Sequence, residues 1–378
     1  MRIALVHSFY SDGEASGENQ VVRQQETLLR NAGHAVGVFS VDSQELQRRP
    51  LYELRTGLNV AMGRGHNFSS ALKSFRPDVV HVHNLFPNIG ARWLREVEAP
   101  VVATVHNFRL TCANGLLFRN GEICRLCVGK SGASGVRLGC YRESSLASLA
   151  VVAGTPQFRK TYAGFSRIIC PSETVQGVLI ESGLSEANLS VLPHAVGVNV
   201  STSSESGNGR WLAVGRLSPE KGFGVLLKSW NPHNYLDIVG SGPLAKELKQ
   251  VAPSSVSLLG SISRSELLRL MPKYDGLVFP SVCYEVQPTV VIEAMASGLP
   301  VVARYRSAGS SIVTANQCGV TYDESGKQHS SLDDALTMAL SRRRELGANG
   351  QRAFSARYSN EVWLEEMNSL YETVIRDE

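Results

Sequence analysis

Two cations in a glycine-bounded loop, Arg216 and Lys221, are the residues of this sequence best suited to chemistry. The loop Gly215–Gly222 follows an apolar run typical of a buried strand and precedes a stretch typical of a helix. Cations fixed at the carboxyl end of a strand can stabilise the charge that builds on a departing diphosphate, without a metal ion. The alternative is a surface turn with two solvated cations, and this loop alone does not decide between the two interpretations.

Two glutamates, Glu285 and Glu293, mark a second such segment. Glu285 precedes a predicted helix, Val290–Ser297, that follows another apolar strand, and Glu293 lies within this helix. A carboxylate there can accept paired hydrogen bonds from a ribose diol, while free backbone N–H groups at the helix start can hold sugar or phosphate oxygens. Glu293 could instead be an exposed helical residue, but its apolar neighbours favour burial, and a buried carboxylate without a partner is costly.

The elements that position these residues follow the pattern of parallel α/β units, because short β-branched runs alternate with amphipathic stretches. The first half predicts strands at Ile3–His7, Ala35–Val41, Val79–His83, Val101–His106, Ile168–Pro171 and Ser190–Leu192. The second half predicts strands at Trp211–Val214, Tyr235–Val239, Val256–Leu259, Gly276–Phe279 and Pro300–Ala303. Parallel sheets bind ligands beyond the carboxyl ends of their strands, so two such domains facing each other would form a cleft.

The predicted domain boundaries come from composition. Residues 196–210 are rich in Ser, Gly and Asn, as linkers are, and separate a domain at 1–195 from a domain at 211–355. The last stretch, 356–378, has apolar residues at helical spacing and could pack back on the N-terminal domain.

Composition limits the class of protein. The chain has 378 residues, of which 43% are hydrophobic and 19% charged, as in ordinary soluble proteins. The net charge of +4 is spread along the chain, which argues against nucleic-acid binding and leaves a weak attraction to an anionic membrane open. No apolar run approaches the roughly 20 residues that span a bilayer, and the N-terminus lacks a signal-peptide cleavage site. We expect a cytoplasmic protein, with peripheral contact at the inner membrane face as an open alternative.

Taken together, these segments resemble glycosyltransferase family 4, whose members are retaining enzymes with two facing Rossmann-like domains, the GT-B architecture. The resemblance is carried by Gly215–Gly222 and by the run from Glu285 through Glu293 to Val302. The intervening segments Leu236–Pro243 and Leu259–Leu267 match in order and spacing, and the similarity covers essentially the whole chain.

This resemblance implies roles for the donor residues. Arg216 and Lys221 would bind the donor diphosphate, Glu293 the ribose, and Glu285 would lie near the transferred sugar. The remaining donor-binding positions that the resemblance implies are Gly215, Gly240, Ser261, Ile262, Val286, Gln287, Pro288 and Thr289. Of these, Val286–Thr289 would surround the sugar hydroxyls, and Gly260–Ser263 would contact the base.

The first domain supports the resemblance at two places. Ser16 and Gly17 occupy the position of a glycine-rich loop, with Ser16 where the family usually has a glycine. His106 resembles the strand-end histidine that faces the transferred sugar, and we predict that it contacts the sugar. Without the resemblance, a structural histidine at a strand end would be the better interpretation of His106, as it is for His81 and His83.

Four of the seven cysteines, Cys112, Cys124, Cys127 and Cys140, lie close together in the sequence. One C-x2-C pair flanked by two single cysteines could supply a tetrahedral thiolate site for structural zinc. Reduced thiols or a redox-sensitive disulfide are the alternatives. A catalytic zinc is not expected here.

The residues and the resemblance together predict a retaining glycosyltransferase that needs no cofactor for catalysis. Its donor would be a nucleoside-diphosphate sugar, most simply a UDP-sugar, and its acceptor a hydroxyl of a glycan, a lipid-linked glycan or a small natural product. A nucleotide-sugar epimerase or phosphorylase of the same architecture is one alternative, and a non-catalytic sugar-nucleotide binding protein is another.

Overall fold

The computed structural model describes residues 1–10, 17–198, 207–323, 326 and 329–377. Contacts along the chain separate it into two compact units, which we treat one at a time. Unit 1 comprises Met1–Leu117, Cys124–Ala195 and Trp363–Glu378, and unit 2 comprises Phe118–Ile123 and Val196–Val362. The predicted linker falls largely on residues 199–206, outside the described residues.

Unit 1 is built on a six-stranded parallel sheet in the order β2-β1-β3-β4-β7-β8. Its strands are β1 (Arg2–Phe9), β2 (Ala35–Asp42), β3 (Val79–Asn84), β4 (Val101–Thr104), β7 (Arg167–Cys170) and β8 (Leu189–Val191). The chain passes from β1 to β2 on one side and then to β3 on the other, so the strand order reverses at β1 and β3. In doubly wound sheets, the carboxyl ends of the strands at such a reversal are the place where ligands bind.

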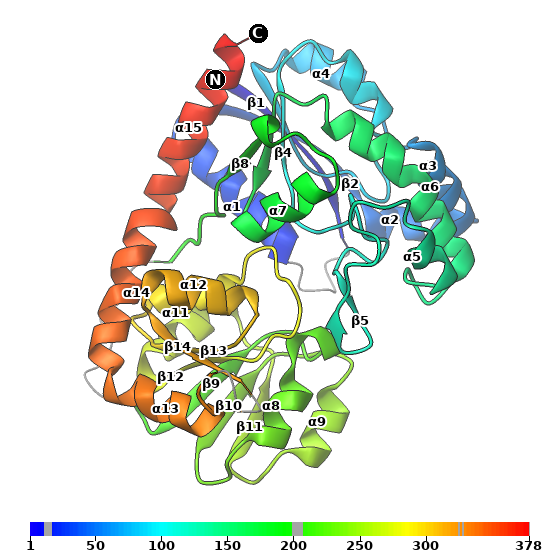
Figure 1. The fold of residues 1–378 in the computed structure, drawn as a ribbon. Coiled ribbons are helices and arrows are strands. Elements are labelled where there is room, and N and C mark those ends of the chain that lie inside the picture. Colours follow the sequence, from blue (N-terminus) through cyan, green and yellow to red (C-terminus); the bar gives the residue numbers. More distant parts are fainter. Residues whose placement is uncertain (11–16, 199–206, 324–325, 327–328, 378) are drawn as a thin grey trace. The chain divides into compact units, whose positions relative to one another are not determined.

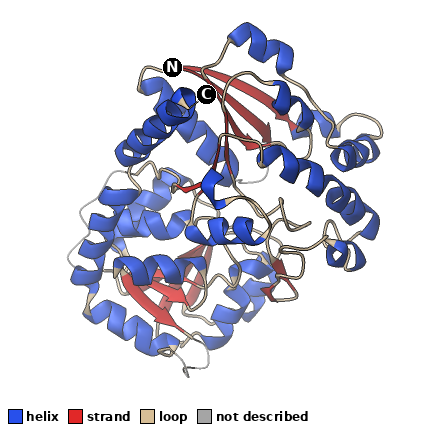
Figure 2. Ribbon diagram, turned by 45° about the horizontal axis from the view of Figure 1, so that its top comes forward, coloured by secondary structure: helices blue, strands red, loops and turns tan. Residues whose placement is uncertain are grey.

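Helices cover both faces of this sheet, which explains why β3 and β4 are buried at every residue (Figure 2). The α-helices of unit 1 among the described residues are α1 (Gly17–Asn31), α2 (Ser43–Gln47), α3 (Tyr52–Met62), α4 (Ser69–Phe75), α5 (Ala133–Arg137), α6 (Ser145–Tyr162), α7 (Glu173–Glu181) and most of α15 (Asn360–Arg376). The long C-terminal helix α15, red in Figure 1, places Trp363, Met367 and Tyr371 in the same core as Ile3 and Leu5 of β1.

Unit 2 is also built on a six-stranded parallel sheet, and its strand order is β11-β10-β9-β12-β13-β14. The strands are β9 (Arg210–Val214), β10 (Tyr235–Val239), β11 (Val256–Gly260), β12 (Gly276–Phe279), β13 (Val301–Arg304) and β14 (Gly319–Tyr322). β14 was missed from the sequence, because its four residues carry only a short apolar signal. The order reverses at β9 and β12, the two strands that precede the loops of Arg216 and Glu285.

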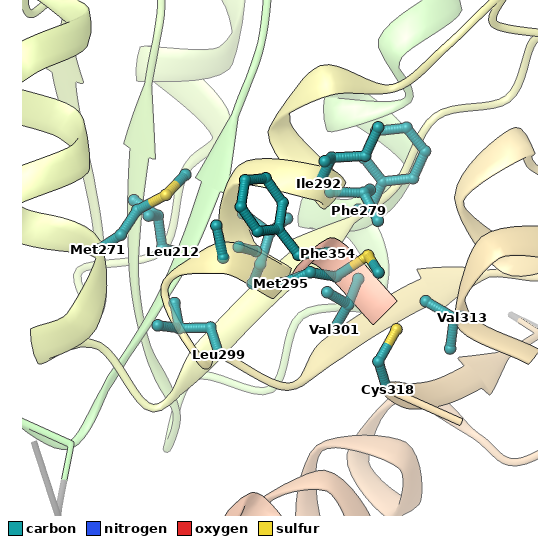
Figure 3. Packing of buried hydrophobic residues seen from close by; sticks show 14 of the residues in the cluster. Leu212, Met271, Phe279, Ile292, Met295, Leu299, Val301, Val313, Cys318 and Phe354 are labelled. Carbon is teal, nitrogen blue, oxygen red and sulfur yellow. The ribbon is translucent and has the colours of Figure 1, made fainter. Parts of the chain in front are cut away.

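The helices of unit 2 are α8 (Phe223–Ser229), α9 (Ala245–Val251), α10 (Arg264–Leu270), α11 (Thr289–Ala296), α12 (Ala308–Asn316), α13 (Leu332–Ser341) and α14 (Arg343–Arg357). Helix α11 is buried from Val291 to Ala296, and its Ile292 and Met295 pack with Phe279 and Phe354 (Figure 3). Burial of most of α11 fixes the end of the loop that joins it to β12. No helix of the described residues has the length and apolar character that crossing a membrane requires.

Candidate functional site

Two loops at the strand reversal of unit 2 pack backbone against backbone. Gly222 has a φ of +73°, and a Cβ added there would lie 2.0 Å from the carbonyl oxygen of Pro280. Only glycine permits this approach. A hydrogen bond from the Val282 N–H to the Glu220 carbonyl (3.0 Å) joins the same loops. The loop after β9 is therefore held directly against the loop after β12.

This packing brings Lys221 to Glu285. The Lys221 Nζ donates to the Glu285 Oε1 at 2.7 Å, and both side chains are largely buried. Burial by itself lowers the pKa of Lys221, but the neighbouring Glu285 carboxylate outweighs it, so the pKa of Lys221 is raised. Lys221 is therefore a fixed, permanently charged group at the carboxyl edge of the sheet.

Arg216 stands at the start of the same loop with its side chain exposed. The Gly215 N–H donates to the Val239 carbonyl at 3.0 Å, which ties the loop to the end of β10. Gly240, with a φ of +147°, approaches the Gly215 carbonyl so closely that a Cβ there would lie 1.9 Å from the oxygen. Gly215 and Gly240 thus shape the loop, and Arg216 is the exposed cation that they position.

The start of α11 supplies backbone donors to the same edge. Pro288 is the N-cap residue of α11 and has no side chain that could cap the helix. The N–H groups of the first turn, including that of Thr289, therefore receive no side-chain cap. Val286 and Gln287, in the segment that leads into the helix, are partly exposed. The N–H groups at the start of a helix and the helix dipole together favour an anion or sugar oxygens at this point.

Glu293 lies on α11 and has a partner that sequence analysis missed. Arg264 is the first residue of α10, and its Nε donates to the Glu293 Oε1 at 2.7 Å. Burial raises the pKa of Glu293, and Arg264 opposes the rise. The spacing of the segment that contains Arg264 carries no local signal that its guanidinium contacts α11.

The predicted base-contacting residues differ in their accessibility. Ser261 is exposed, and its hydroxyl donates to the Ser241 Oγ at 2.9 Å. Ile262 packs against the apolar core of unit 2. The side chain of Ser261 is thus available at the surface of unit 2, and that of Ile262 serves mainly the core.

Unit 1 gathers five imidazoles at the carboxyl end of its sheet. His106 follows β4, and its Nε2 lies 3.0 Å from the Nδ1 of His83 at the end of β3. His83 stacks on His81 with centroids 4.2 Å apart, and His106 stacks on His194 at 4.9 Å. The fifth ring, His7, lies on β1. Burial, and then the neighbouring imidazoles, hold the pKa of His83 and His106 well below the ordinary 6.5.

A cavity of about 50 Å³ opens beside these histidines, which is room for a few water molecules. His106, Asn107 and Arg109, which follow β4, line this cavity together with Asn84, the last residue of β3, and α6 adds an apolar wall. The Arg109 guanidinium lies over the Phe86 ring at 4.1 Å. Asn84, Asn107 and Arg109 were not predicted as site residues, because they belong to no motif of their own.

The start of α1 contributes a buried acid to this region. Burial raises the pKa of Glu18 to about 8, although Arg109 and hydrogen bonds from Asn107 and Asn84 oppose the rise. The Glu18 Oε1 has no hydrogen-bond partner among the residues that the structure describes. Gly17, the first residue of α1, is exposed, and a Cβ there would meet no atom within 4 Å. Ser16 lies outside the described residues.

The prediction of a structural zinc is not supported. No disulfide joins the cysteines, and the described part of the chain contains no group of three or more His, Cys, Asp or Glu side chains that could hold a metal. Cys112 donates its thiol hydrogen to Asn114 at 3.0 Å, and Cys140 packs beside an apolar cluster that includes Val60 and Val151. Burial raises the pKa of Cys127. Cys112 and Cys124 lie near enough to Cys127 to raise its pKa further, but the described residues do not complete a metal site.

Two family descriptions match the sequence. Residues 15–200 match "Glycosyltransferase Family 4", and residues 208–341 match "Glycosyl transferases group 1". The chain is 24% identical over 372 residues to alpha-monoglucosyldiacylglycerol synthase of Streptococcus pneumoniae, covering 85% of this chain and 75% of that protein. It is also 31% identical over 163 residues to the GDP-mannose-dependent alpha-mannosyltransferase of Mycolicibacterium smegmatis, covering 43% of this chain and 42% of that protein.

Solved structures resemble the chain over its full length. Sucrose-phosphate synthase of Thermosynechococcus elongatus has a TM-score of 0.69 at 19% identity and covers 100% of both chains. Anabaena HepE in complex with UDP has a TM-score of 0.62 at 16% identity, covering 99% of this chain and 100% of that one. The likeness confirms the predicted GT-B fold.

Proposed function

Because this chain belongs to glycosyltransferase family 4, we propose that it moves a sugar from a nucleoside-diphosphate sugar to an acceptor hydroxyl and retains the anomeric configuration. The observation that supports this most directly is the arrangement at the strand reversal of unit 2. Fixed Lys221, exposed Arg216 and the open start of α11 all lie around the ends of β9 and β12. This is a site for an anion that is joined to a sugar.

The proposed reaction exchanges one bond at the anomeric carbon for another. The bond from that carbon to the diphosphate oxygen breaks with its electron pair leaving on the diphosphate, and the acceptor oxygen forms the new bond on the same face. The acceptor proton goes to the departing diphosphate. Arg216 and Lys221 stabilise the leaving charge in place of a metal ion, so catalysis needs no metal.

We assign Glu293 to the ribose and Glu285 to the neighbourhood of the transferred sugar. Arg264 occupies one oxygen of Glu293, which leaves the other oxygen to accept a hydrogen bond from a hydroxyl. Lys221 likewise bonds only one oxygen of Glu285. Each carboxylate is thus oriented by a cation and keeps acceptor capacity toward a ligand.

We propose a uridine diphosphate sugar as the donor. The support is that HepE, which shares the fold, was solved with UDP and with UDP-glucose. A guanosine carrier is the competing choice, because one relative is named a GDP-mannose-dependent enzyme. A screen of UDP-, GDP-, dTDP- and ADP-sugars for thermal stabilisation and slow hydrolysis tests the donor. Stabilisation by UDP-sugars is expected, and a response to GDP-sugars alone would overturn this assignment.

Among the acceptor classes, a lipid-linked glycan or glycolipid is supported by an exposed apolar face on unit 1. Helices α3 and α6 pack closely, because a Cβ at Gly154 would lie only 2.1 Å from the Val60 carbonyl. Five leucines stand exposed on this pair or just before α3: Leu51 (66%), Leu54 (62%), Leu58 (54%), Leu146 (79%) and Leu149 (50%). We call them the α3–α6 leucines. α6 is therefore only partly buried, not a wholly buried helix.

These leucines also support peripheral contact with an anionic membrane. Arg48, Arg49 and Arg55 are exposed beside or on α3. Apolar side chains that enter a lipid interface next to cations combine hydrophobic burial with attraction to acidic headgroups. We propose that unit 1 meets the membrane through this face.

Simple measurements distinguish two rival activities from glycosyl transfer. An epimerase would change the configuration of the sugar without an acceptor, and a phosphorylase would consume inorganic phosphate. A non-catalytic binding protein would bind the donor and leave it intact. Release of nucleoside diphosphate that depends on an added acceptor, with retained configuration in the product, supports the proposed function. Donor binding without any turnover across acceptor classes would contradict it.

A further inference from the structure

His83 is buried with one bonded and one unbonded ring nitrogen. Its Nδ1 lies 3.0 Å from the Nε2 of His106, whereas its Nε2 is buried and has no hydrogen-bond partner within the described part of the chain. His81 stacks on His83 but directs its own nitrogens elsewhere, to the Tyr371 hydroxyl and the Thr104 Oγ1, both at 2.7 Å. His83 therefore has a single hydrogen bond, and that bond goes to His106.

This environment determines where the proton of His83 lies. Desolvation keeps both rings neutral at pH 7, because burial lowers the pKa of each well below 6.5. A buried N–H without an acceptor is rarer in folded proteins than an under-used acceptor. The unbonded Nε2 of His83 is therefore the lone-pair nitrogen, and the hydrogen sits on Nδ1.

The position of the proton on His83 determines the tautomer of His106. A hydrogen on the His83 Nδ1 points at the His106 Nε2, which must accept it and must itself carry no hydrogen. The single proton of neutral His106 is then on its Nδ1. Unlike the His83 Nε2, the His106 Nδ1 is not among the buried unpartnered atoms of the described residues, and His106 lines the cavity.

We propose that His83 is a positioning residue that holds His106 as the Nδ1–H tautomer, so that His106 offers its ligand a hydrogen-bond donor and not a base. The ligand group that fits a neutral donor is a hydroxyl or ether oxygen of a sugar. The inference rests on the proposed function in assigning that sugar to His106, but the tautomer is a property of the protein without ligand.

The direct test is the tautomeric state of His106 in protein labelled with 15N-histidine, read from long-range 1H–15N spectra at neutral pH. His106→Asn identifies the signals. The wild type is expected to show a protonated Nδ1 and an unprotonated Nε2. His83→Leu removes the donor and should allow the Nε2–H form, whereas His83→Asn keeps an N–H close to the Nδ1 position and should retain the wild-type pattern. His233→Leu, at an exposed position in unit 2, is the matched control.

Kinetics supply a second readout. His83→Leu should lower kcat/KM by about 10- to 100-fold, the effect of losing one well-placed hydrogen bond, and His83→Asn should recover most of it. In a His83→Leu, His106→Ala double variant the losses should not add, because His83 acts through His106. A wild-type His106 protonated on Nε2, or a tautomer unchanged in folded His83→Leu, would overturn the inference. A wild type without transferase activity but with the Nδ1–H form would contradict the proposed function alone.

Discussion

The Nζ of Lys221 and the Oε1 of Glu285 lie 2.7 Å apart, although the two residues belong to loops that follow different strands. The pair is possible because β9 and β12 are neighbours in the sheet and because Gly222 lets the two loops touch. In the proposed reaction Lys221 stabilises the leaving diphosphate, and Glu285 keeps the lysine in place.

Lys221→Met should lower kcat by at least about 100-fold, because a preorganised charge at the leaving group is lost. Lys228→Met, on the exposed side of the adjacent helix α8, is the matched control and should leave kcat unchanged. Steady-state kinetics with the donor found by the screen measure both. A folded Lys221→Met variant with normal turnover would remove Lys221 from the mechanism.

Arg264→Ala should destabilise unit 2 by about 1–3 kcal/mol, because it leaves the buried Glu293 carboxylate without its cation. Loss of Arg264 also removes the interaction that holds down the pKa of Glu293. A carboxyl whose pKa is higher in the folded state destabilises that state as the pH rises, so the cost should shrink at pH 4.5 relative to pH 7.

The control for this change is Arg269→Ala on the same helix, whose partner Glu266 is exposed. A surface pair of this kind contributes about 0–1 kcal/mol. Chemical denaturation of both variants at the two pH values checks the prediction. Equal losses in the free energy of unfolding for the Arg264 and Arg269 variants would show that the buried pair contributes no more to stability than the surface pair.

Acid should destabilise unit 1 through its buried histidines. Burial lowers the pKa of His7 to about 4 and of His81 and His194 to about 3, and their ordinary value is 6.5. Their contribution to stability is complete above pH 6.5 and is lost as the pH falls toward the folded-state pKa, since the unfolded chain binds protons first. Each such histidine adds a slope of up to about 1.4 kcal/mol per pH unit.

Unfolding measured between pH 7 and pH 5 should show this loss of stability, and His194→Gln should reduce its slope. His233→Gln removes an exposed imidazole and should leave the slope as it is. A stability that stays constant from pH 7 to pH 5 would mean that these imidazoles remain accessible to protons in the folded chain.

The α3–α6 leucines should be needed for membrane contact. Replacing Leu54 and Leu58 by Gln should weaken sedimentation with vesicles that contain acidic phospholipid by about tenfold or more, because less apolar surface enters the interface. The pair Leu259→Gln and Leu340→Gln, also exposed but in unit 2, is the control and should bind as the wild type does. Equal binding of both double variants would place the membrane contact elsewhere or rule it out.

Chelation of metal ions should not change the rate of glycosyl transfer if Arg216 and Lys221 stabilise the leaving diphosphate in place of a metal ion. Activity measured after treatment with EDTA and gel filtration is expected to equal that of untreated protein. A loss that returns with added Mg²⁺ or Mn²⁺ would show that Arg216 and Lys221 are insufficient for the leaving diphosphate.

Local patterns were enough to predict most of the fold. Apolar runs located nearly all the described strands, because a strand buried on both faces must be apolar along its length. The loop of Arg216 and Lys221 and the segment of Glu285 and Glu293 were visible for the same reason. Their polar residues interrupt the pattern at the point where a strand ends.

The order of the elements and the residue types at their ends can therefore be read from local sequence. The partners of those residues depend on the tertiary structure: Arg264 for Glu293 and His83 for His106. Such contacts depend on which strands lie side by side and how closely two backbones approach. Those features arise from the packing of distant segments, and no local spacing encodes them.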